Sequence, residues 1–290
     1  MAAEQVWTVL RALTWTADRF ARAGLASPRL DAELLLAAAT SLDRVALYTG
    51  FDRPLSAAER TRYRQLVQQR LDGQPVAYLV GKREFFSLEL LVDARVLIPR
   101  PETEHVVEAA LDAIDALGER KAVRVVDVGT GSGAIAIAIK REQPSVRVLA
   151  TELEPGALEV ARKNAARHDV EIEFFEGDLL EPVRACAPFD LVVSNPPYIR
   201  TADLTALEAE VRAEPRAALD GGLDGLAILG RLVVQAAPLL AAAGGALVTE
   251  IGADQGPAAC ALVRATGAFA EPRVLRDLAG HDRVLVATRT

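Results

Sequence analysis

Strand-like and helical stretches alternate from Val123 onward, and this alternation constrains the fold more than any other feature of the chain. Short apolar runs with the length of buried strands lie at Val123–Val128, Val146–Thr151, Ile172–Phe175, Phe189–Val193 and Ala246–Ile251. Helical stretches such as Gly133–Arg141 and Pro155–Arg167 lie between them. The alternation predicts a mostly parallel sheet with helices on both faces. Two further runs, Arg273–Leu275 and Val284–Thr288, could form an antiparallel hairpin at the sheet edge.

The residues before this region predict a separate, all-helical domain over residues 1–75. Leu10 and Leu13 belong to a set of apolar residues with helical spacing. Ser56, followed three residues later by Glu59, forms a capping-box pattern that indicates the start of a helix. No polar cluster in this domain suggests chemistry, so it either packs or binds a partner.

Between the two regions, residues 76–98 predict a β-hairpin that links them. Two strand-like runs, Phe85–Val92 and Val96–Ile98, are separated by a short break in which we expect the turn. Residues 99–290 then form the last domain, which contains the parallel sheet. It begins with Pro99-Arg100-Pro101, a stiff and exposed corner.

The strand predicted at Phe189–Val193 runs directly into Ser194-Asn195-Pro196-Pro197-Tyr198. Neither proline can donate a backbone hydrogen bond, so the chain must leave the sheet there. Asn195 offers a side-chain oxygen and Pro196 a carbonyl oxygen, and two acceptors can hold the two hydrogens of a planar NH₂ group. Tyr198 can pack its ring over a flat group. The alternative is an ordinary proline-rich turn after a strand.

A second site is predicted where the first strand of the sheet ends in Gly129-Thr130-Gly131-Ser132-Gly133 and a helix follows. Glycines allow close backbone approach to a ligand, and a helix N-terminus supplies free amides. Glu152 ends the next strand, where an acid can accept both hydroxyls of a ribose. Asp178 and Leu179 follow the third strand, where contacts to adenine would lie. The alternative is that these features have no common function: the glycines form an ordinary tight turn, Glu152 is a surface acid and Asp178 is a loop residue. This alternative requires that all three occur in the right order by chance.

Composition excludes several classes of protein. The 290 residues are 51% hydrophobic, and the net charge of −7 argues against a general nucleic-acid-binding surface. Cys186 and Cys260 lie far apart, so we expect neither a disulfide framework nor a metal site. The N-terminal residues lack a signal sequence, and no apolar run has the length of a membrane span. These features predict a cytoplasmic protein without membrane contact.

Together the two sites resemble those of the class I S-adenosylmethionine-dependent methyltransferases, and the Asn-Pro-Pro-Tyr string resembles members that methylate an amide or the exocyclic amine of adenine. Three further stretches look like the signature of the peptide chain release factor glutamine methyltransferases: Gly73–Tyr78, Ile98–Glu104 and Glu214–Leu226. The resemblance covers nearly the whole chain. It implies a Rossmann-like α/β fold, S-adenosylmethionine as cofactor, and N5-methylation of the glutamine in the Gly-Gly-Gln loop of bacterial release factors.

The resemblance also assigns roles to individual residues. It implies that the cofactor is bound by Gly129, Thr130, Gly131, Ser132, Gly133, Glu152, Asp178, Leu179 and Asn195. It implies that the substrate glutamine is bound by Asn195, Pro196, Pro197, Tyr198 and Arg100. Of these, Asn195, Pro196 and Tyr198 would act in catalysis, and the helical domain would bind the release factor. Many relatives have Asp where this chain has Glu152, and some have an aromatic residue where it has Leu179.

Three other functions remain open from the sequence. A glutamine methyltransferase acting on a ribosomal protein would carry similar motifs, and an adenine-N6 methyltransferase would hold a flipped base in the same corner. The acidic balance and the absence of a basic recognition domain oppose direct nucleic-acid binding. A binding module with a vestigial cofactor site is the non-enzymatic alternative. Glu250, at the end of a central strand, is a further candidate residue, and Arg200–Gly225 has the length of a substrate-contacting flap.

Overall fold

A computed structural model describes residues 6–118, 122–242 and 244–290 of the chain. Its contacts divide the chain into two compact units. The helical unit comprises the residues up to Gly81 together with Glu208–Ala213, and the sheet unit comprises Lys82–Leu207 and Glu214–Thr290. Within the described ranges, no helix has both the length and the apolar character needed to cross a membrane.

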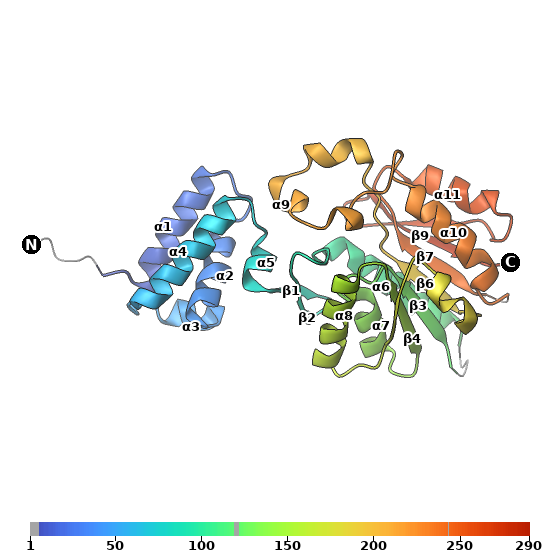
Figure 1. Cartoon of the computed structure of the whole chain (residues 1–290), viewed down its shortest axis with the longest axis horizontal. Coiled ribbons are helices and arrows are strands. Elements are labelled where there is room, and N and C mark those ends of the chain that lie inside the picture. Colours follow the sequence, from blue (N-terminus) through green and yellow to red (C-terminus); the bar gives the residue numbers. More distant parts are fainter. Residues whose placement is uncertain (1–5, 119–121, 243) are drawn as a thin grey trace, which may run out of the picture. The chain divides into compact units, whose positions relative to one another are not determined.

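The helical unit is built from short helices (Figure 1), and the apolar residues that they bury form one core. Its helices are α1 (Val9–Arg22), α2 (Pro28–Thr40), α3 (Arg44–Thr49), α4 (Ala57–Leu71), α5 (Val76–Val80) and the short α9 (Ala209–Arg212). Leu13, Phe20 and Leu35 are fully buried in this core. The capping box predicted at the start of α4 is confirmed, because Ser56 Oγ accepts from the Glu59 amide and Glu59 Oε2 accepts from the Ser56 amide.

A buried arginine ties α9 to the other helices of this unit. The Arg70 side chain on α4 is 4% exposed, and its Nε donates to Asp31 Oδ2 of α2 at 2.8 Å. The same guanidinium pairs with Glu210 of α9 and donates to the carbonyl oxygen of Gln74. The middle of the predicted flap Arg200–Gly225 therefore belongs to the helical unit.

The sheet unit contains the parallel sheet with an antiparallel edge that the sequence predicts. Its strands are β3 (Arg124–Val128), β4 (Arg147–Glu152), β5 (Glu173–Glu176), β6 (Leu191–Ser194), β7 (Ala246–Glu250), β8 (Arg273–Arg276) and β9 (Asp282–Thr288). Across the described residues the strand order is β5-β4-β3-β6-β7-β9-β8. The pairs from β5 to β7 are parallel, whereas β9 runs antiparallel to both β7 and β8.

Helices cover both faces of this sheet. Successive strand residues point to opposite sides, and because both sides carry apolar residues, each side is packed against helices. Val125 packs into a core with α6 (Glu104–Ala116) and α7 (Ala134–Glu142), while its neighbour Val126 packs with α10 (Ala227–Leu239) and α11 (Gly256–Ala265). Short 3₁₀ turns complete the connections, at Pro101–Thr103, Glu181–Cys186, Thr201–Ala206 and Arg216–Ala218.

The hairpin exists, but its turn does not lie where the sequence suggested. Its strands are β1 (Lys82–Phe85) and β2 (Leu88–Leu91), so the run Phe85–Val92 contains the turn and Val96–Ile98 is not a strand. The turn residues Phe86 and Ser87 have φ of 49° and 59°. Two positive φ values are typical of a tight hairpin turn that Asn and Gly usually mark, and neither residue type is present here to reveal it.

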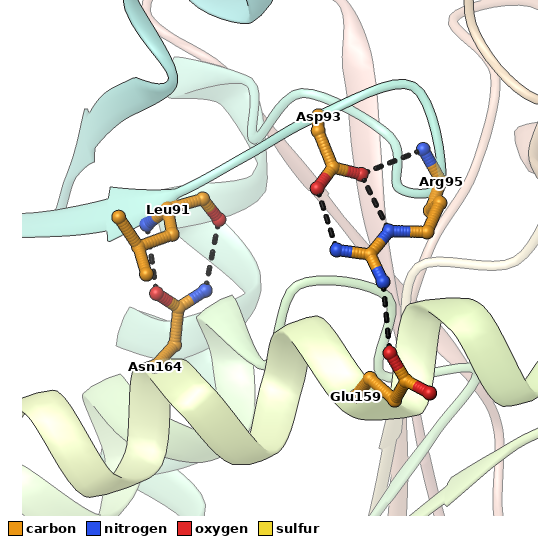
Figure 2. Close-up of polar contacts among 5 residues, drawn as sticks. All are labelled: Leu91, Asp93, Arg95, Glu159 and Asn164. Carbon is orange, nitrogen blue, oxygen red and sulfur yellow. Dashed lines mark hydrogen bonds and ion pairs between the residues drawn. The ribbon is translucent and has the colours of Figure 1, made fainter.

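Two contacts hold the end of this hairpin to helix α8 (Pro155–Arg167), as Figure 2 shows. Asn164 is fully buried; its Oδ1 accepts from the Leu91 amide at 2.7 Å and its Nδ2 donates to the Leu91 carbonyl at 2.9 Å. Farther along, Arg95 pairs with Asp93 and donates to Glu159 Oε2 at 2.9 Å. One tether is a buried neutral amide and the other is an exposed ion pair.

Candidate active site

Strands β3 and β6 end side by side at the point where the strand connections of the sheet reverse direction. From β3 the chain goes to β4 on one side, whereas β6 lies on the other. Val128 and Ser194 are partners in the parallel register, and Ser194 Oγ donates to the Val128 carbonyl at 2.7 Å. Ligands bind at such a switch point, at the carboxyl ends of the strands. The glycine loop and the Asn195–Tyr198 motif follow directly from these two ends.

The glycine loop presents open backbone. Gly129 and Gly131 have φ of 70° and 56°, and a Cβ built on either would meet nothing within 4 Å. Gly133, by contrast, begins α7 and packs closely against Ile137 and Ala161. The first two glycines therefore leave room for a ligand against the loop, and the third allows the helix to pack against its neighbour.

Asp127, the buried residue two positions before this loop, holds the loop to the helix. Its Oδ2 accepts from Thr130 Oγ1 at 2.6 Å and from the Ala136 amide at 3.2 Å. Burial raises the pKa of Asp127 to about 7, against the lowering effect of these hydrogen bonds, and the nearby Glu152 adds to the rise. The loop thus rests on a carboxyl group that titrates near neutral pH.

The acid at the end of β4 points to the same loop. Glu152 Oε2 accepts from the Gly131 amide at 2.8 Å and Oε1 accepts from the Glu154 amide at 3.0 Å. Asp178, after β5, pairs with Arg231 of α10. Leu179 follows with φ of 49°.

On the other side, the Asn195–Tyr198 motif is held by a hydrogen-bonded chain that leads to Glu250. Asn195 Nδ2 donates to Thr103 Oγ1 at 3.0 Å, and Thr103 Oγ1 donates to Glu250 Oε2 at 2.6 Å. Tyr198 donates its hydroxyl to Glu250 Oε1 at 3.2 Å. The side chain of Gln255 holds the backbone of the motif, because its Nε2 donates to the Tyr198 carbonyl at 3.0 Å. Burial raises the pKa of both Tyr198 and Glu250.

Most of the residues expected at the two sites line one cavity: Gly129, Thr130, Gly131, Ser132, Glu152, Asp178, Leu179, Asn195, Pro196 and Pro197. The other expected residues make different contacts.

Gly133 packs against Ile137 and Ala161, and the Tyr198 hydroxyl donates to Glu250. The guanidinium of Arg100 pairs with the buried Glu214, whose other oxygen accepts from the Ile98 amide at 2.9 Å. In the part of the chain described here, no group of three or more His, Cys, Asp or Glu residues could hold a metal ion.

The cavity also has residues that the sequence did not single out. Thr103, Pro215, Ala218, Ile228 and Arg231 are among them. Thr103 and Pro215 lie within stretches that resemble family signatures, so a position-by-position reading of those stretches could have found them. Ile228 and Arg231 carry no local signal, because only the packing of α10 against one face of the sheet brings them to this edge.

Sequence identity to proteins of known family shows which family this chain belongs to. The sequence is 44% identical to a release factor glutamine methyltransferase of Geobacter sulfurreducens over 97% of this chain and 96% of that protein. It is 42% identical to one of Rhodopirellula baltica over 96% and 95% of the two chains. The chain belongs to the release factor glutamine methyltransferase family. It is therefore an enzyme that uses S-adenosylmethionine, as the sequence predicted.

Family models and solved structures agree with this membership. The PrmC N-terminal domain matches residues 11–81, and the methyltransferase small domain matches residues 109–248. A methyltransferase from Pyrococcus furiosus is 17% identical with a TM-score of 0.52, over 78% of this chain and 97% of that one. The hMettl16 catalytic domain with the MAT2A 3′UTR hairpin 1 is 16% identical with a TM-score of 0.56, over 81% and 83%. These two likenesses show the fold, and they confirm the Rossmann-like methyltransferase sheet.

The cavity of this family member fits an S-adenosylmethionine molecule. The open backbone at Gly129 and Gly131 forms a cradle that a side chain would fill. Glu152 brings a carboxylate to the next strand end, where ribose hydroxyls can donate to it, and Leu179 offers an apolar contact. When bound, the cofactor supplies an activated methyl group on a positively charged sulfur.

Proposed function

We propose that this enzyme transfers a methyl group from S-adenosylmethionine to the side-chain nitrogen, N5, of the glutamine in the Gly-Gly-Gln loop of peptide chain release factors. The observation that carries the proposal is the placement of Asn195 and Pro196 on the same cavity as the glycine loop. The names of the relatives support a glutamine of a release factor as the acceptor.

The chemistry requires precise orientation, because an amide nitrogen is a weak nucleophile whose lone pair is delocalised into the carbonyl group. Asn195 Oδ1 and the Pro196 carbonyl oxygen each accept one N–H of the substrate amide. These two hydrogen bonds aim the nitrogen at the methyl carbon and stabilise the positive charge that develops on it. Pro197 stiffens the path of the backbone, so that the two acceptors keep their spacing.

The transfer is balanced without a metal or a strong base. The new N–C bond forms as the bond from the methyl carbon to sulfur breaks, and the electron pair stays on sulfur. The methylated nitrogen is acidic at that moment and releases one proton to solvent. Tyr198, whose pKa is raised by burial and by the adjacent Glu250, keeps its proton and contributes its ring to the wall around the amide.

We assign binding of the release factor to the helical domain, residues 1–75, and we assign residues 99–290 as the methyltransferase domain. Residues 76–98 are the linker, although α5 occupies Val76–Val80 and only β1 and β2 form the hairpin that the sequence predicted for this stretch. Helix α1 supports this role, because Trp15 is 47% exposed and Leu10 is 42% exposed on its surface. Arg19 lies 5.5 Å from the centre of the Trp15 ring, so the exposed surface combines an aromatic group with positive charge. Aromatic and arginine residues are enriched at protein interfaces.

The test uses labelled S-adenosylmethionine with a purified release factor and with its Gln→Ala variant at the Gly-Gly-Gln loop. We expect label in the first protein and none in the second, with the methyl group on the glutamine side chain in peptide mass spectra. In the enzyme, Asn195→Ala should lower kcat by about 100-fold or more, while the cofactor Kd changes by less than about threefold, because the glycine loop is intact. Label in RNA, DNA or a ribosomal protein instead of the release factor would overturn the proposal.

A further inference from the structure

Glu250 is a buried acid beside the proposed site, and the chemistry above does not use it. It ends strand β7, adjacent to β6, and is 1% exposed. Its two oxygens accept hydrogen bonds from Thr103 and Tyr198, at 2.6 Å and 3.2 Å. Thr103 lines the cavity, and Tyr198 directly follows the cavity residue Pro197. A buried carboxylate is costly to maintain, so one that contacts both residues needs a reason.

The hydrogen bond from Thr103 to Glu250 determines which group donates in the hydrogen bond between Thr103 and Asn195. An ionised carboxylate only accepts, so the single hydroxyl proton of Thr103 is committed to Glu250. The oxygen of Thr103 is then left as an acceptor, and the group of Asn195 that faces it at 3.0 Å must be the NH₂ group. With its NH₂ group held by Thr103, Asn195 has its carbonyl oxygen left for the cavity.

We propose that Glu250 is a positioning residue that, through Thr103, fixes the side-chain amide of Asn195 with its oxygen toward the substrate, and that directly holds the ring of Tyr198. This inference rests on the proposed function, because the oriented oxygen is the one that accepts from the substrate amide. Without the hydrogen bond to Thr103, the side-chain amide of Asn195 can rotate by about 180° and present its NH₂ group to the cavity. That group is a donor, so it repels the N–H bonds of the substrate amide.

Burial disfavours the ionised form of Glu250, whereas two hydrogen bonds and one nearby positive charge favour it. Burial raises the pKa of Glu250; the hydrogen bonds from Thr103 and Tyr198 and the charge of Arg283 oppose the rise, and the charge of Glu102 adds to it. Arg283 is itself paired with Asp277 at 3.0 Å. A protonated Glu250 could donate to Thr103 and so reverse the hydrogen-bonded chain.

The first test compares Thr103→Val with Thr103→Ser. Valine keeps the size and branching of threonine but removes the hydroxyl, so kcat for release factor methylation should fall by about 100-fold. The KM for the release factor and the Kd for the cofactor should change by less than about threefold, because neither the partner surface nor the glycine loop is altered. Serine restores the hydroxyl, and Thr103→Ser should keep kcat within about threefold of the wild-type value.

The second test uses Glu250→Gln, which retains the size of the side chain but can donate as well as accept. It should lower kcat by about tenfold, because a glutamine that donates to Thr103 reverses the hydrogen-bonded chain and Asn195 then presents its NH₂ group to the cavity in most molecules. It should leave the unfolding midpoint equal to or above that of the wild type, because it removes a buried charge. A purely structural role predicts the opposite, a lower midpoint together with lower activity.

Two outcomes would overturn the inference. One is a Thr103→Val enzyme with wild-type kcat, and the other is a Thr103→Ser enzyme as slow as the valine variant. If Thr103→Val does not fold, a Glu250→Gln enzyme with wild-type kcat serves as the refuting result. The wild-type reaction separates the two proposals: an inactive wild-type enzyme contradicts the proposed function, whereas an active one with insensitive variants contradicts only the role of Glu250.

Discussion

Replacement of Asn164 by alanine should destabilise the sheet unit and weaken cofactor binding at the same time. Asn164 lies on α8, is fully buried, and makes three hydrogen bonds to main-chain atoms: two to Leu91 and one, at 2.8 Å, from Nδ2 to the Ser132 carbonyl oxygen. Asn164 therefore connects the hairpin, as Figure 2 shows, to the loop containing Ser132, which lines the cavity.

The magnitude follows from the number of groups left without a partner. Each hydrogen bond contributes about 1 kcal/mol net, and an unsatisfied buried group adds to the loss, so Asn164→Ala should cost about 3 to 5 kcal/mol. For a unit of roughly 200 residues, such a loss lowers Tm by about 10 °C. The loop containing Ser132 loses a support, so the cofactor Kd should rise by about tenfold.

A matched control lies on the same helix. Glu159 pairs with Arg95 in an exposed ion pair, with side chains 65% and 39% exposed. Solvent and salt screen such a pair, so Glu159→Ala should cost less than about 1 kcal/mol, and its effect should vanish at high salt. The Asn164→Ala loss should be insensitive to salt, because the amide is neutral.

The assay is denaturant unfolding followed by far-ultraviolet circular dichroism, with tryptophan fluorescence as a second probe. Both tryptophans of the chain, Trp7 and Trp15, belong to the helical unit, so a native fluorescence spectrum shows that this unit is still folded in the variant. A loss below about 1 kcal/mol for Asn164→Ala, or losses of equal size for the two variants, would refute the reasoning that the buried amide is the stronger tether.

Two further predictions concern buried charges. Because the pKa of Asp127 is raised from 3.8 to about 7, the native state holds this proton more tightly than the unfolded chain. The free energy of unfolding of the cofactor-free enzyme should therefore fall as pH rises from about 4 to about 7, by at most about 4 kcal/mol, and urea titrations of Asp127→Asn should lack this slope. In the helical unit, Arg70→Ala leaves the carboxylate of Asp31 buried and unpaired. It should cost about 3 kcal/mol in the unfolding transition seen by tryptophan fluorescence, and an unchanged transition would contradict it.

The sequence predicted the elements whose signals are local. Apolar runs of strand length located β3, β4 and β6, and prolines and glycines located the turns at the ends of β3 and β6, because these residue types restrict or free the backbone directly. The hairpin turn at Phe86-Ser87 was misplaced because it lacks such a local signal: its positive φ values occur in residue types that rarely adopt them. The role of Asn164 was also not predictable, because an asparagine inside a helix pattern gives no sign that its side chain hydrogen-bonds to a strand.

The parts of the site that orient the reacting groups were the least visible in the sequence. Thr103 and Asn195 are 92 positions apart, and Thr103 and Glu250 are 147 positions apart. Only the fold, which brings the ends of β6 and β7 and the start of α6 to one edge, makes them neighbours. A pattern within one stretch can therefore indicate that Asn195 meets a planar NH₂ group, but cannot indicate what sets the orientation of its amide.

Glu250 shows why stability and activity should respond in opposite directions at this site. Its pKa is raised, so above pH 4.5 the folded enzyme carries a penalty for ionising this group, and that penalty grows until pH passes the folded pKa. A residue selected only for packing would be replaced by glutamine or an apolar side chain, which remove the penalty. Retaining an acid here is reasonable if only an ionised carboxylate forces Thr103 to accept from Asn195. A Glu250→Gln enzyme that is both more stable and slower would demonstrate that the charge serves the orientation of the amide rather than the integrity of the fold.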